Sequence, residues 1–256
     1  MNILIIGDIV GQSGVNKIKN DLPNLIKEKN IDFVIANGEN SSDGMGITSK
    51  IFKELIACGV NVITMGNHTW GKKDIFNIID NKNLIRPANY PKDIPGNGYG
   101  IFDYNGKKIA VINLIGRASM NVLSDNPFIK ADEIINKIKD ETDIIIIDFH
   151  AEATAEKIAM GYNLENRVSC VFGTHTHVQT ADEKILDSGM AYITDVGMTG
   201  PSESVLGLKK EIAVHRFKTG EWTHYECSTN KAIFNAIEIE YDDNTKKAVS
   251  IKRINE

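Results

Sequence analysis

The chain has 256 residues, 42% of them hydrophobic, which is enough to bury one sizeable core, and no linker-like stretch divides it, so we predict a single domain over residues 1–256. The formal net charge of −5 comes from interspersed charges of both signs without a basic stripe, which argues against a groove for long nucleic acid. No apolar run approaches the length of a membrane span and the first strand lacks the features of a signal peptide, so we expect no membrane partner and a cytoplasmic location.

The first half of the chain alternates short apolar runs with segments of helical periodicity. The expected elements are a strand at 3–6, a helix through 15–25 that Pro23 kinks or restarts, a strand at 33–36, a helix at 49–58, a strand at 60–65 and a helix at roughly 72–82. This βαβα order implies parallel strands joined by right-handed crossovers.

The second half adds antiparallel hairpins to the same pattern. The expected elements are a hairpin of strands 99–104 and 109–114, helices at 129–139 and 155–162, strands at 143–147, 168–172, 184–195 and 212–217, a loop at 197–204, and a hairpin over 234–254. The whole pattern predicts an α/β fold in which two mixed sheets pack together with helices outside.

Five polar clusters stand where the apolar runs end. They are Gly7-Asp8, Gly38-Glu39-Asn40, Gly66-Asn67-His68, Asp148-Phe149-His150 and Gly173-Thr174-His175-Thr176-His177. Strands that end in Asp, Glu, Asn or His bring these side chains together along one edge of a sheet. Seven or eight oxygen and nitrogen donors gathered there would bind two metal ions, and such a site indicates a hydrolase.

Each cluster taken alone also has an ordinary structural interpretation. Asp8 fits a helix N-cap or a turn, Glu39 an exposed loop, and His68 a surface histidine beside a turn asparagine. Histidines at i and i+2, as at His175 and His177, suit two adjacent metal ions but also a core histidine with a surface neighbour.

The distribution of the histidines favours the metal site. Four of the six histidines fall within the strand-end clusters. The other two, His215 and His224, lack such a context, and we expect them to be structural or exposed to solvent.

Together the clusters resemble the motif set of the calcineurin-like metallophosphoesterases, which is D-x-H, G-D, G-N-H, H and G-H-x-H, each at a strand end. Val10 stands where that superfamily has a metal-binding histidine, and Glu39 stands where it has a bridging aspartate. Both departures, with the run Asp195-Val196-Gly197-Met198-Thr199-Gly200, are similar to the YmdB-type bacterial phosphodiesterase subfamily. The resemblance runs from Met1 to about Phe217 and implies a four-layer α/β/β/α sandwich.

The resemblance also implies a dinuclear metal centre. The first ion would be held by Asp8, Asn40 and His177, and the second by Asn67, His150 and His175, with Glu39 bridging the two. Asn40 would replace the donor lost at Val10. Iron is the metal associated with the family, manganese is a credible substitute, and the ligand types also admit zinc.

The activity implied is that of a 2′,3′-cyclic nucleotide 2′-phosphodiesterase, in which a metal-bridged hydroxide attacks a small phosphodiester. His68 directly follows the expected ligand Asn67, so it borders the site and is the candidate proton donor to the leaving alkoxide. The alternative is that His68 only orients Asn67. A homo-oligomer is expected as well.

Two other functions fit the same residues. A phosphomonoesterase or nucleotidase could use the same ligands, because metal ligands do not distinguish a diester from a monoester. A regulatory protein that binds a nucleotide with little turnover belongs to a different class, and a metal-loaded preparation that never hydrolyses a diester would favour it.

Overall fold

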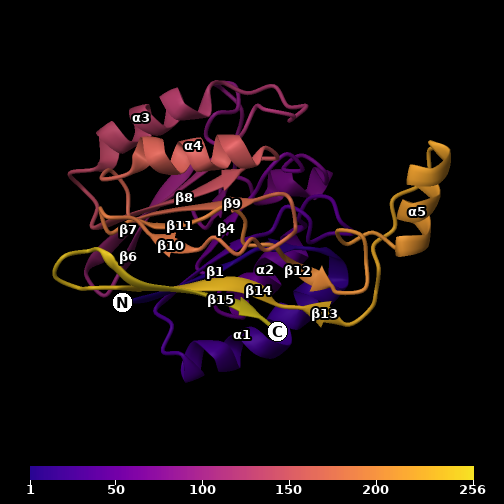
Figure 1. Ribbon diagram of the computed structural model, residues 1–256, viewed down its shortest axis with the longest axis horizontal. Helices are drawn as coiled ribbons and strands as arrows, with labels where there is room; N and C mark the ends of the chain where they lie inside the picture. The colour runs from indigo at the N-terminus through magenta and orange to yellow at the C-terminus, as the bar shows by residue number, and fades with distance from the viewer.

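The computed structural model describes all 256 residues and has four layers (Figure 1). Two six-stranded sheets lie face to face, and helices cover the outer face of each. The predicted α/β/β/α sandwich of two mixed sheets flanked by helices is therefore confirmed. None of the helices combines the length and the apolar character that crossing a membrane requires.

The first sheet contains the N-terminal parallel strands and the C-terminal hairpin. Its order is β15 (Ala248–Asn255), β14 (Asn235–Tyr241), β1 (Asn2–Ile6), β3 (Phe33–Asn37), β4 (Val62–Thr64) and β5 (Leu84–Ile85). Strands β1, β3, β4 and β5 are parallel, whereas β14 is antiparallel to both of its neighbours. Helices α1 (Gly11–Glu28) and α2 (Ser49–Ala57) pack on its outer face.

The second sheet is built around four parallel strands. Its order is β10 (Lys184–Ile185), β11 (Ala191–Ile193), β9 (Cys170–Thr174), β8 (Ile144–His150), β7 (Lys107–Ile115) and β6 (Tyr99–Tyr104). The two edge strands are antiparallel to their neighbours. Helices α3 (Pro127–Ile138) and α4 (Thr154–Leu164) pack on its outer face.

The alternation of residues along β1 explains the layers. Ile3 and Ile5 belong to the core between the two sheets, whereas Leu4 and Ile6 belong to the core under α1 and α2. Successive side chains of a strand point to opposite faces, so a strand that is apolar throughout must be covered on both sides. The continuous apolar run at the start of the sequence therefore makes β1 a central strand.

Several expected elements differ in the structure, among them the single strand expected at 184–195, which is divided into the antiparallel strands β10 and β11. Pro23 lies within one continuous helix, so no second helix begins after Asp21. The helix expected at 72–82 is only the short 3₁₀ helix η1 (Lys73–Asn77), and Asn81 beyond it accepts a hydrogen bond from the Asn83 amide. Such local side-chain bonds compete with helix formation.

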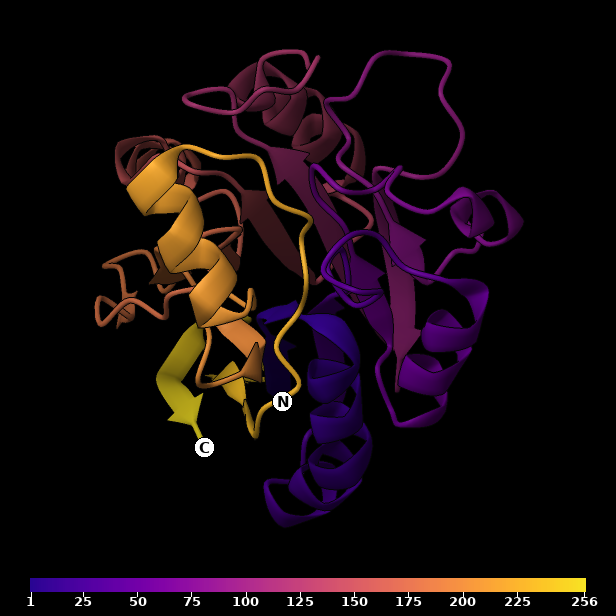
Figure 2. The same ribbon diagram turned by 90° about the vertical axis from the view of Figure 1, so that its right-hand side faces the viewer.

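The strand expected at 212–217 is instead helix α5 (Lys210–Thr219). The alternation of Ile212 and Val214 is typical of a strand, but no sheet edge accompanies this segment. Gly220 ends the helix in the left-handed conformation, at φ 72°, and its amide donates to the Arg216 carbonyl. In Figure 1 α5 projects from the layers, and in Figure 2, which is viewed from that side, it lies in front of them.

A third, three-stranded sheet was not expected. It joins β2 (Asp8–Ile9) to β12 (Met198–Pro201) and β13 (Ala232–Ile233), so the first part of the segment 197–204 is a buried strand and not a loop. Asp8 pairs with Met198 in parallel register. This small sheet fixes the backbone of Asp8 at the edge of the sandwich.

Replacing Ile146 tests the core between the sheets. Ile146 is fully buried between the two sheets, so Ile146→Ala should lower the free energy of unfolding by about 2–5 kcal/mol in urea denaturation. The control Val249→Ala, at a position 54% exposed, should change it by less than about 0.5 kcal/mol. Equal effects of the two variants would contradict the assigned core.

Candidate metal centre

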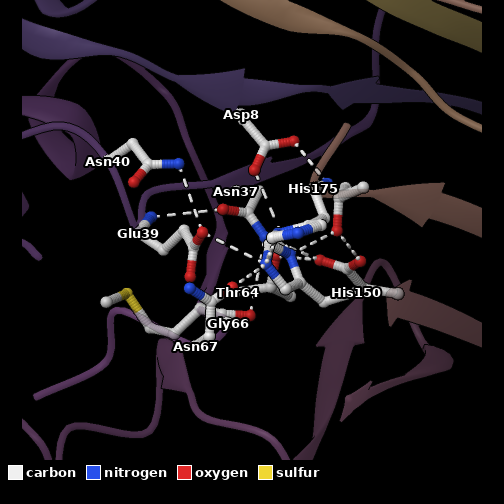
Figure 3. A network of polar contacts seen from close by, with 12 residues as sticks. Asp8, Asn37, Glu39, Asn40, Thr64, Gly66, Asn67, His150 and His175 are labelled. Carbon is white, nitrogen blue, oxygen red and sulfur yellow. Dashed lines mark hydrogen bonds and ion pairs between the residues drawn. The ribbon is translucent and has the colours of Figure 1, made fainter. Parts of the chain in front are cut away.

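The strand-end clusters meet at one edge of the sandwich, as the sequence predicts. Asp8 lies on β2, Glu39 and Asn40 follow β3, Asn67 and His68 follow β4, His150 is the last residue of β8, and His175 and His177 follow β9. Figure 3 shows side chains from both large sheets pointing toward one another. All seven predicted ligands and His68 belong to one connected set of polar contacts, in which the contact between His150 and Glu39 joins the two halves.

One group of donors surrounds the imidazole of His150. Its Nε2 atom lies 3.1 Å from Glu39 Oε1, 3.1 Å from His175 Nδ1 and 3.0 Å from Asn67 Oδ1. The ligand atoms of Glu39, His150 and His175 all lie within 4.8 Å of one another. Atoms at these separations could share one metal ion.

A second group of donors lies beside the first. Here His177 Nε2 lies 3.0 Å from Asn40 Nδ2 and 3.7 Å from Asp8 Oδ1. Asn40 Nδ2 also donates to Glu39 Oε1 over 3.2 Å. Glu39 Oε1 therefore contacts both groups, which is the position a bridging ligand requires.

The polar atoms of these groups fit a bound cation. The carboxylates of Asp8 and Glu39 are fully buried, and Asp8 Oδ1 is a buried oxygen without any hydrogen-bond partner. A buried unpaired carboxylate oxygen is costly, and a metal ion would satisfy it. The Asn40 amide contacts both Glu39 and His177, so it lies within the same set of polar groups.

Hydrogen bonds orient the imidazole rings of His150 and His177. His150 Nδ1 lies 2.8 Å from Thr174 Oγ1, and the Thr174 hydroxyl donates to the buried carboxylate of Asp148 over 2.7 Å. His177 Nδ1 lies 3.0 Å from the carbonyl of Leu206. Donation by Nδ1 in both rings leaves Nε2 free to face the site, which is the arrangement of many metal-binding histidines.

The backbone that carries the two later histidines is strained. His175 and His177 have φ values of 99° and 65°, in the left-handed region that side chains rarely adopt. The His175 amide donates to Asp8 Oδ2 over 3.1 Å, and Thr176 donates its amide and its hydroxyl to Asp195 Oδ2. Strain of this kind persists only where the surroundings hold it, and it is concentrated at functional sites.

Asp195 is in turn held by a buried lysine. Lys157 Nζ on α4 lies 2.7 Å from Asp195 Oδ2, and both side chains are almost fully buried. Lys157 thus supports the turn between His175 and His177 without contacting either histidine. Lys157 was missed in the sequence, although its spacing from Met160 and Leu164 places a charge on the buried face of a helix.

The charges of the site shift several pKa values. Burial alone would raise the pKa of Glu39, but the neighbouring His150 charge and its hydrogen bond hold that pKa well below the usual range. Burial would lower the pKa of His150, but the Glu39 carboxylate outweighs it and raises that pKa to about 9. Burial and the His150 charge lower the pKa of His175 to about 3, so its imidazole is neutral and able to bind a cation.

The remaining two histidines lie outside this cluster. His215, on α5, pairs with Glu221 over 2.7 Å, and His224 stacks edge-on with Trp222. Both are exposed, which agrees with the expectation that they have no part in the site.

Comparison with known proteins decides the family. The sequence profile of the YmdB-like protein family matches residues 4–254. The chain belongs to the YmdB-like protein family. It is 51% identical over 255 residues to the 2′,3′-cyclic-nucleotide 2′-phosphodiesterase of Bacillus subtilis, an alignment that covers 99% of this chain and 96% of the relative. It is 40% identical over 261 residues to a putative phosphatase/phosphodiesterase of Mycoplasma pneumoniae, covering 99% of this chain and 92% of that one.

Solved structures agree with this assignment. A crystal structure described as a novel phosphatase of Mycoplasma pneumoniae superposes with a TM-score of 0.95 at 40% identity and covers 100% of this chain and 93% of that chain. A hypothetical protein of Thermus thermophilus superposes with a TM-score of 0.94 at 35% identity, covering 100% and 99%. A putative 5′-nucleotidase of Staphylococcus aureus shares the fold alone, with a TM-score of 0.63 at 14% identity, covering 99% of this chain and 54% of that chain.

These relatives confirm the predicted hydrolase at a general level. The chain is a hydrolase of the phosphodiesterase or phosphatase kind, and its Glu39, His150 and His175 form a group that could hold a metal ion.

Metal binding should release protons. Burial, opposed by the charges of His177 and His150, raises the pKa of Asp8 to about 6, and the pKa of His150 is about 9. Below about pH 9 a metal ion must displace the proton of His150, and below about pH 6 it must also displace the proton of Asp8. The affinity for the metal should therefore rise with pH. Titration with Mn²⁺ should give about a tenfold gain in affinity per pH unit between these values and a steeper gain below them. An affinity independent of pH would contradict these ligands.

The buried lysine should matter for stability. Lys157→Met leaves the Asp195 carboxylate buried without its cation, which should cost about 3–5 kcal/mol in the free energy of unfolding. The control Lys50→Met, at a lysine whose side chain is 84% exposed, should cost less than about 0.5 kcal/mol. Thermal and urea denaturation of both variants measure the difference, and a neutral Lys157→Met would remove the ion pair from the support of the site.

Proposed function

We propose that this chain hydrolyses the phosphodiester of small cyclic nucleotides, of the 2′,3′-cyclic type, with a dinuclear metal centre. The observation that carries the proposal is the pair of donor groups that share the buried Glu39 carboxylate. The Bacillus subtilis relative, 51% identical along nearly the whole chain, is named for the hydrolysis of such nucleotides.

The seven ligands divide between two ions in this proposal. Asp8, Asn40 and His177 hold the first ion, Asn67, His150 and His175 hold the second, and Glu39 contacts both. Iron is the proposed metal and manganese its substitute, because carboxylate, amide and imidazole ligands suit both. Bound ions supply Lewis-acid charge, which activates water and neutralises the phosphoryl oxygens. A cytoplasmic location and a homo-oligomeric state stay predictions.

His68 is the proposed proton donor to the leaving alkoxide. Its ring lines the cleft over the donor groups, a cleft of about 280 Å³, and its side chain is one-third exposed. His68 Nδ1 lies 2.7 Å from Asn40 Oδ1, and its amide donates to Glu39 Oε2 over 2.9 Å. These two bonds fix the ring and leave Nε2 for the substrate. Burial lowers the pKa of His68 despite the Glu39 charge, so the protonated ring is a stronger acid.

A substrate panel tests the reaction. Metal-loaded protein is given 2′,3′-cyclic nucleotides, 3′,5′-cyclic nucleotides, linear diesters and nucleoside monophosphates, and products are separated by chromatography. The proposal expects the 2′,3′-cyclic substrates to be opened to monophosphates with the highest kcat/KM. Release of inorganic phosphate from monophosphates as the dominant reaction would favour a phosphomonoesterase, which the name of the Mycoplasma pneumoniae relative also allows.

Replacing His68 tests the proton donor. His68→Ala should lower kcat on a 2′,3′-cyclic nucleotide by about 10²- to 10⁴-fold, because the alkoxide loses its proton source, while bound metal stays nearly unchanged. On bis(p-nitrophenyl) phosphate, whose leaving group needs no proton, the loss should be much smaller. The control His215→Ala, at the exposed histidine of α5, should leave both activities unchanged.

Two results would reassign His68. Loss of metal in His68→Ala would make it a structural residue that orients Asn40. An equal loss of activity on both substrates would show that it does not deliver the proton.

A further inference from the structure

Two hollows on the surface share a wall beside the metal centre. The cleft over the donor groups and a larger, mostly apolar groove of about 510 Å³ along α5 both have Leu206 and Tyr225 in their lining. The groove also contains Phe217 and Trp222, which are 88% and 82% exposed. Leu206 and Tyr225 are called the shared wall below.

The backbone of Leu206 is strained. Leu206 has φ 54° and Gly207 has φ 95°, so two left-handed residues form the tight turn between Val205 and Leu208, whose amides and carbonyls bond to each other. Glycine adopts this conformation freely, but a leucine does so at a cost. Strain at a half-exposed leucine beside a binding site points to a function for its side chain.

The turn is tied to the metal centre. The Leu206 carbonyl accepts the hydrogen bond of His177 Nδ1 over 3.0 Å, so one residue connects a proposed ligand to the apolar groove. Below the turn, Gly207 lies against Val10, since a Cβ at Gly207 would come within 2.4 Å of Val10 Cγ1. The backbone at Leu206 is therefore held by the hydrogen bond that orients His177 and by the close packing of Gly207 on Val10.

Tyr225 supplies an aromatic face next to Leu206. Its ring packs over Gly44, where an added Cβ would lie 2.4 Å from the ring edge, so the ring is held in place. Burial and the neighbouring Cys227 raise the pKa of Tyr225 to about 12, so its hydroxyl is neutral. A fixed, uncharged ring beside a leucine suits a flat aromatic group of the substrate.

We propose that the shared wall of Leu206 and Tyr225 is the nucleobase-binding surface, which places the base at the mouth of the apolar groove while the phosphodiester lies on the donor groups. In a cyclic nucleotide the ribose joins the phosphate to the base. In the protein Leu206 lies between the proposed ligand His177 and the groove, so the two binding surfaces are neighbours as the phosphate and base are. Stacking on an aromatic face accepts any base, so the wall favours nucleotides over base-free phosphodiesters without selecting one base. This inference rests on the proposed function.

The test compares a substrate with a base to one without it. The pair is adenosine 2′,3′-cyclic phosphate and methyl β-ribofuranoside 2′,3′-cyclic phosphate, which have the same reacting ring. The measured quantity is the ratio of their kcat/KM values, in which any common effect on the metal centre cancels. Wild-type protein should favour the nucleotide by about ten- to a hundredfold.

Two variants should abolish most of this preference. Leu206→Gly removes the side chain while easing the strained φ, so the fold and the carbonyl bond to His177 are kept, and the ratio should fall at least about threefold. Tyr225→Ala should lower it at least about tenfold, whereas Tyr225→Phe, which keeps the ring, should not. The control Leu123→Gly, at a leucine 81% exposed and outside both hollows, should leave the ratio unchanged.

Failure of the inference can be told from failure of the proposed function. A wild-type ratio near one, or a ratio unchanged in Leu206→Gly and Tyr225→Ala, would overturn the base-binding wall while leaving hydrolysis intact. If neither substrate is hydrolysed, the proposed function fails, and calorimetry with adenosine 3′-monophosphate against methyl riboside 3-phosphate on Mn²⁺-loaded protein still decides the wall. Selective binding of the nucleotide that is lost in Leu206→Gly would support it, and equal binding would overturn it.

Base binding beside the groove also has to be distinguished from use of the groove as a contact between two copies of the chain. Phe217→Ala with Trp222→Ala is analysed by light scattering together with the substrate ratio. Two results together would assign the groove to a subunit interface and overturn the inference. The double variant would have a lower molecular mass with an unchanged substrate ratio, and Tyr225→Ala would also leave the ratio unchanged.

Discussion

The buried carboxylate of Glu39 organises this protein's polar edge. Its Oε1 contacts His150 and Asn40, and its Oε2 accepts a hydrogen bond from the His68 amide. One side chain therefore joins both donor groups and the proposed acid. A carboxylate taken out of water is stable only when its oxygens are satisfied, and here every neighbour that satisfies them has a place in the site. The requirement extends to Gly66, where a Cβ would lie 2.4 Å from Glu39 Oε2 and 2.3 Å from His150 Nε2. Only glycine lets the two large sheets bring these atoms together.

The fold around this edge could be predicted from the sequence wherever a single residue pattern is enough to identify an element. Continuous apolar runs identify the central strands, because only a strand covered on both faces tolerates them, and the Asn105-Gly106 turn identifies its hairpin, with φ values of 51° and 80°. The ligand clusters could be found for the same reason, since polar residues directly after buried strands need an explanation. The single domain over residues 1–256 stays a prediction.

Other elements could not be predicted because their conformation depends on distant partners. Ile212 and Val214 have the spacing of a strand, but α5 has no sheet edge beside it and is helical. The strand β12 contains Gly200 and Pro201, which weaken a strand signal, and it forms because β2 lies alongside it. Lys157 has the spacing of the buried face of α4, but its partner Asp195 is 38 residues away, and nothing local reveals that the two meet. The resemblance to a family supplied the division of the ligands between two ions, which spacing alone did not.

The packing around Val10 restricts which residue can occupy this position. Val10 is fully buried, and added Cβ atoms at Gly200 and Gly207 would approach it to 2.9 and 2.4 Å, so the two glycines fill the space around it. The larger imidazole that the wider superfamily carries at this position has no room here. A histidine there would require the turn that supports His177 to move at the same time, so Val10, the two glycines and that turn can change only together.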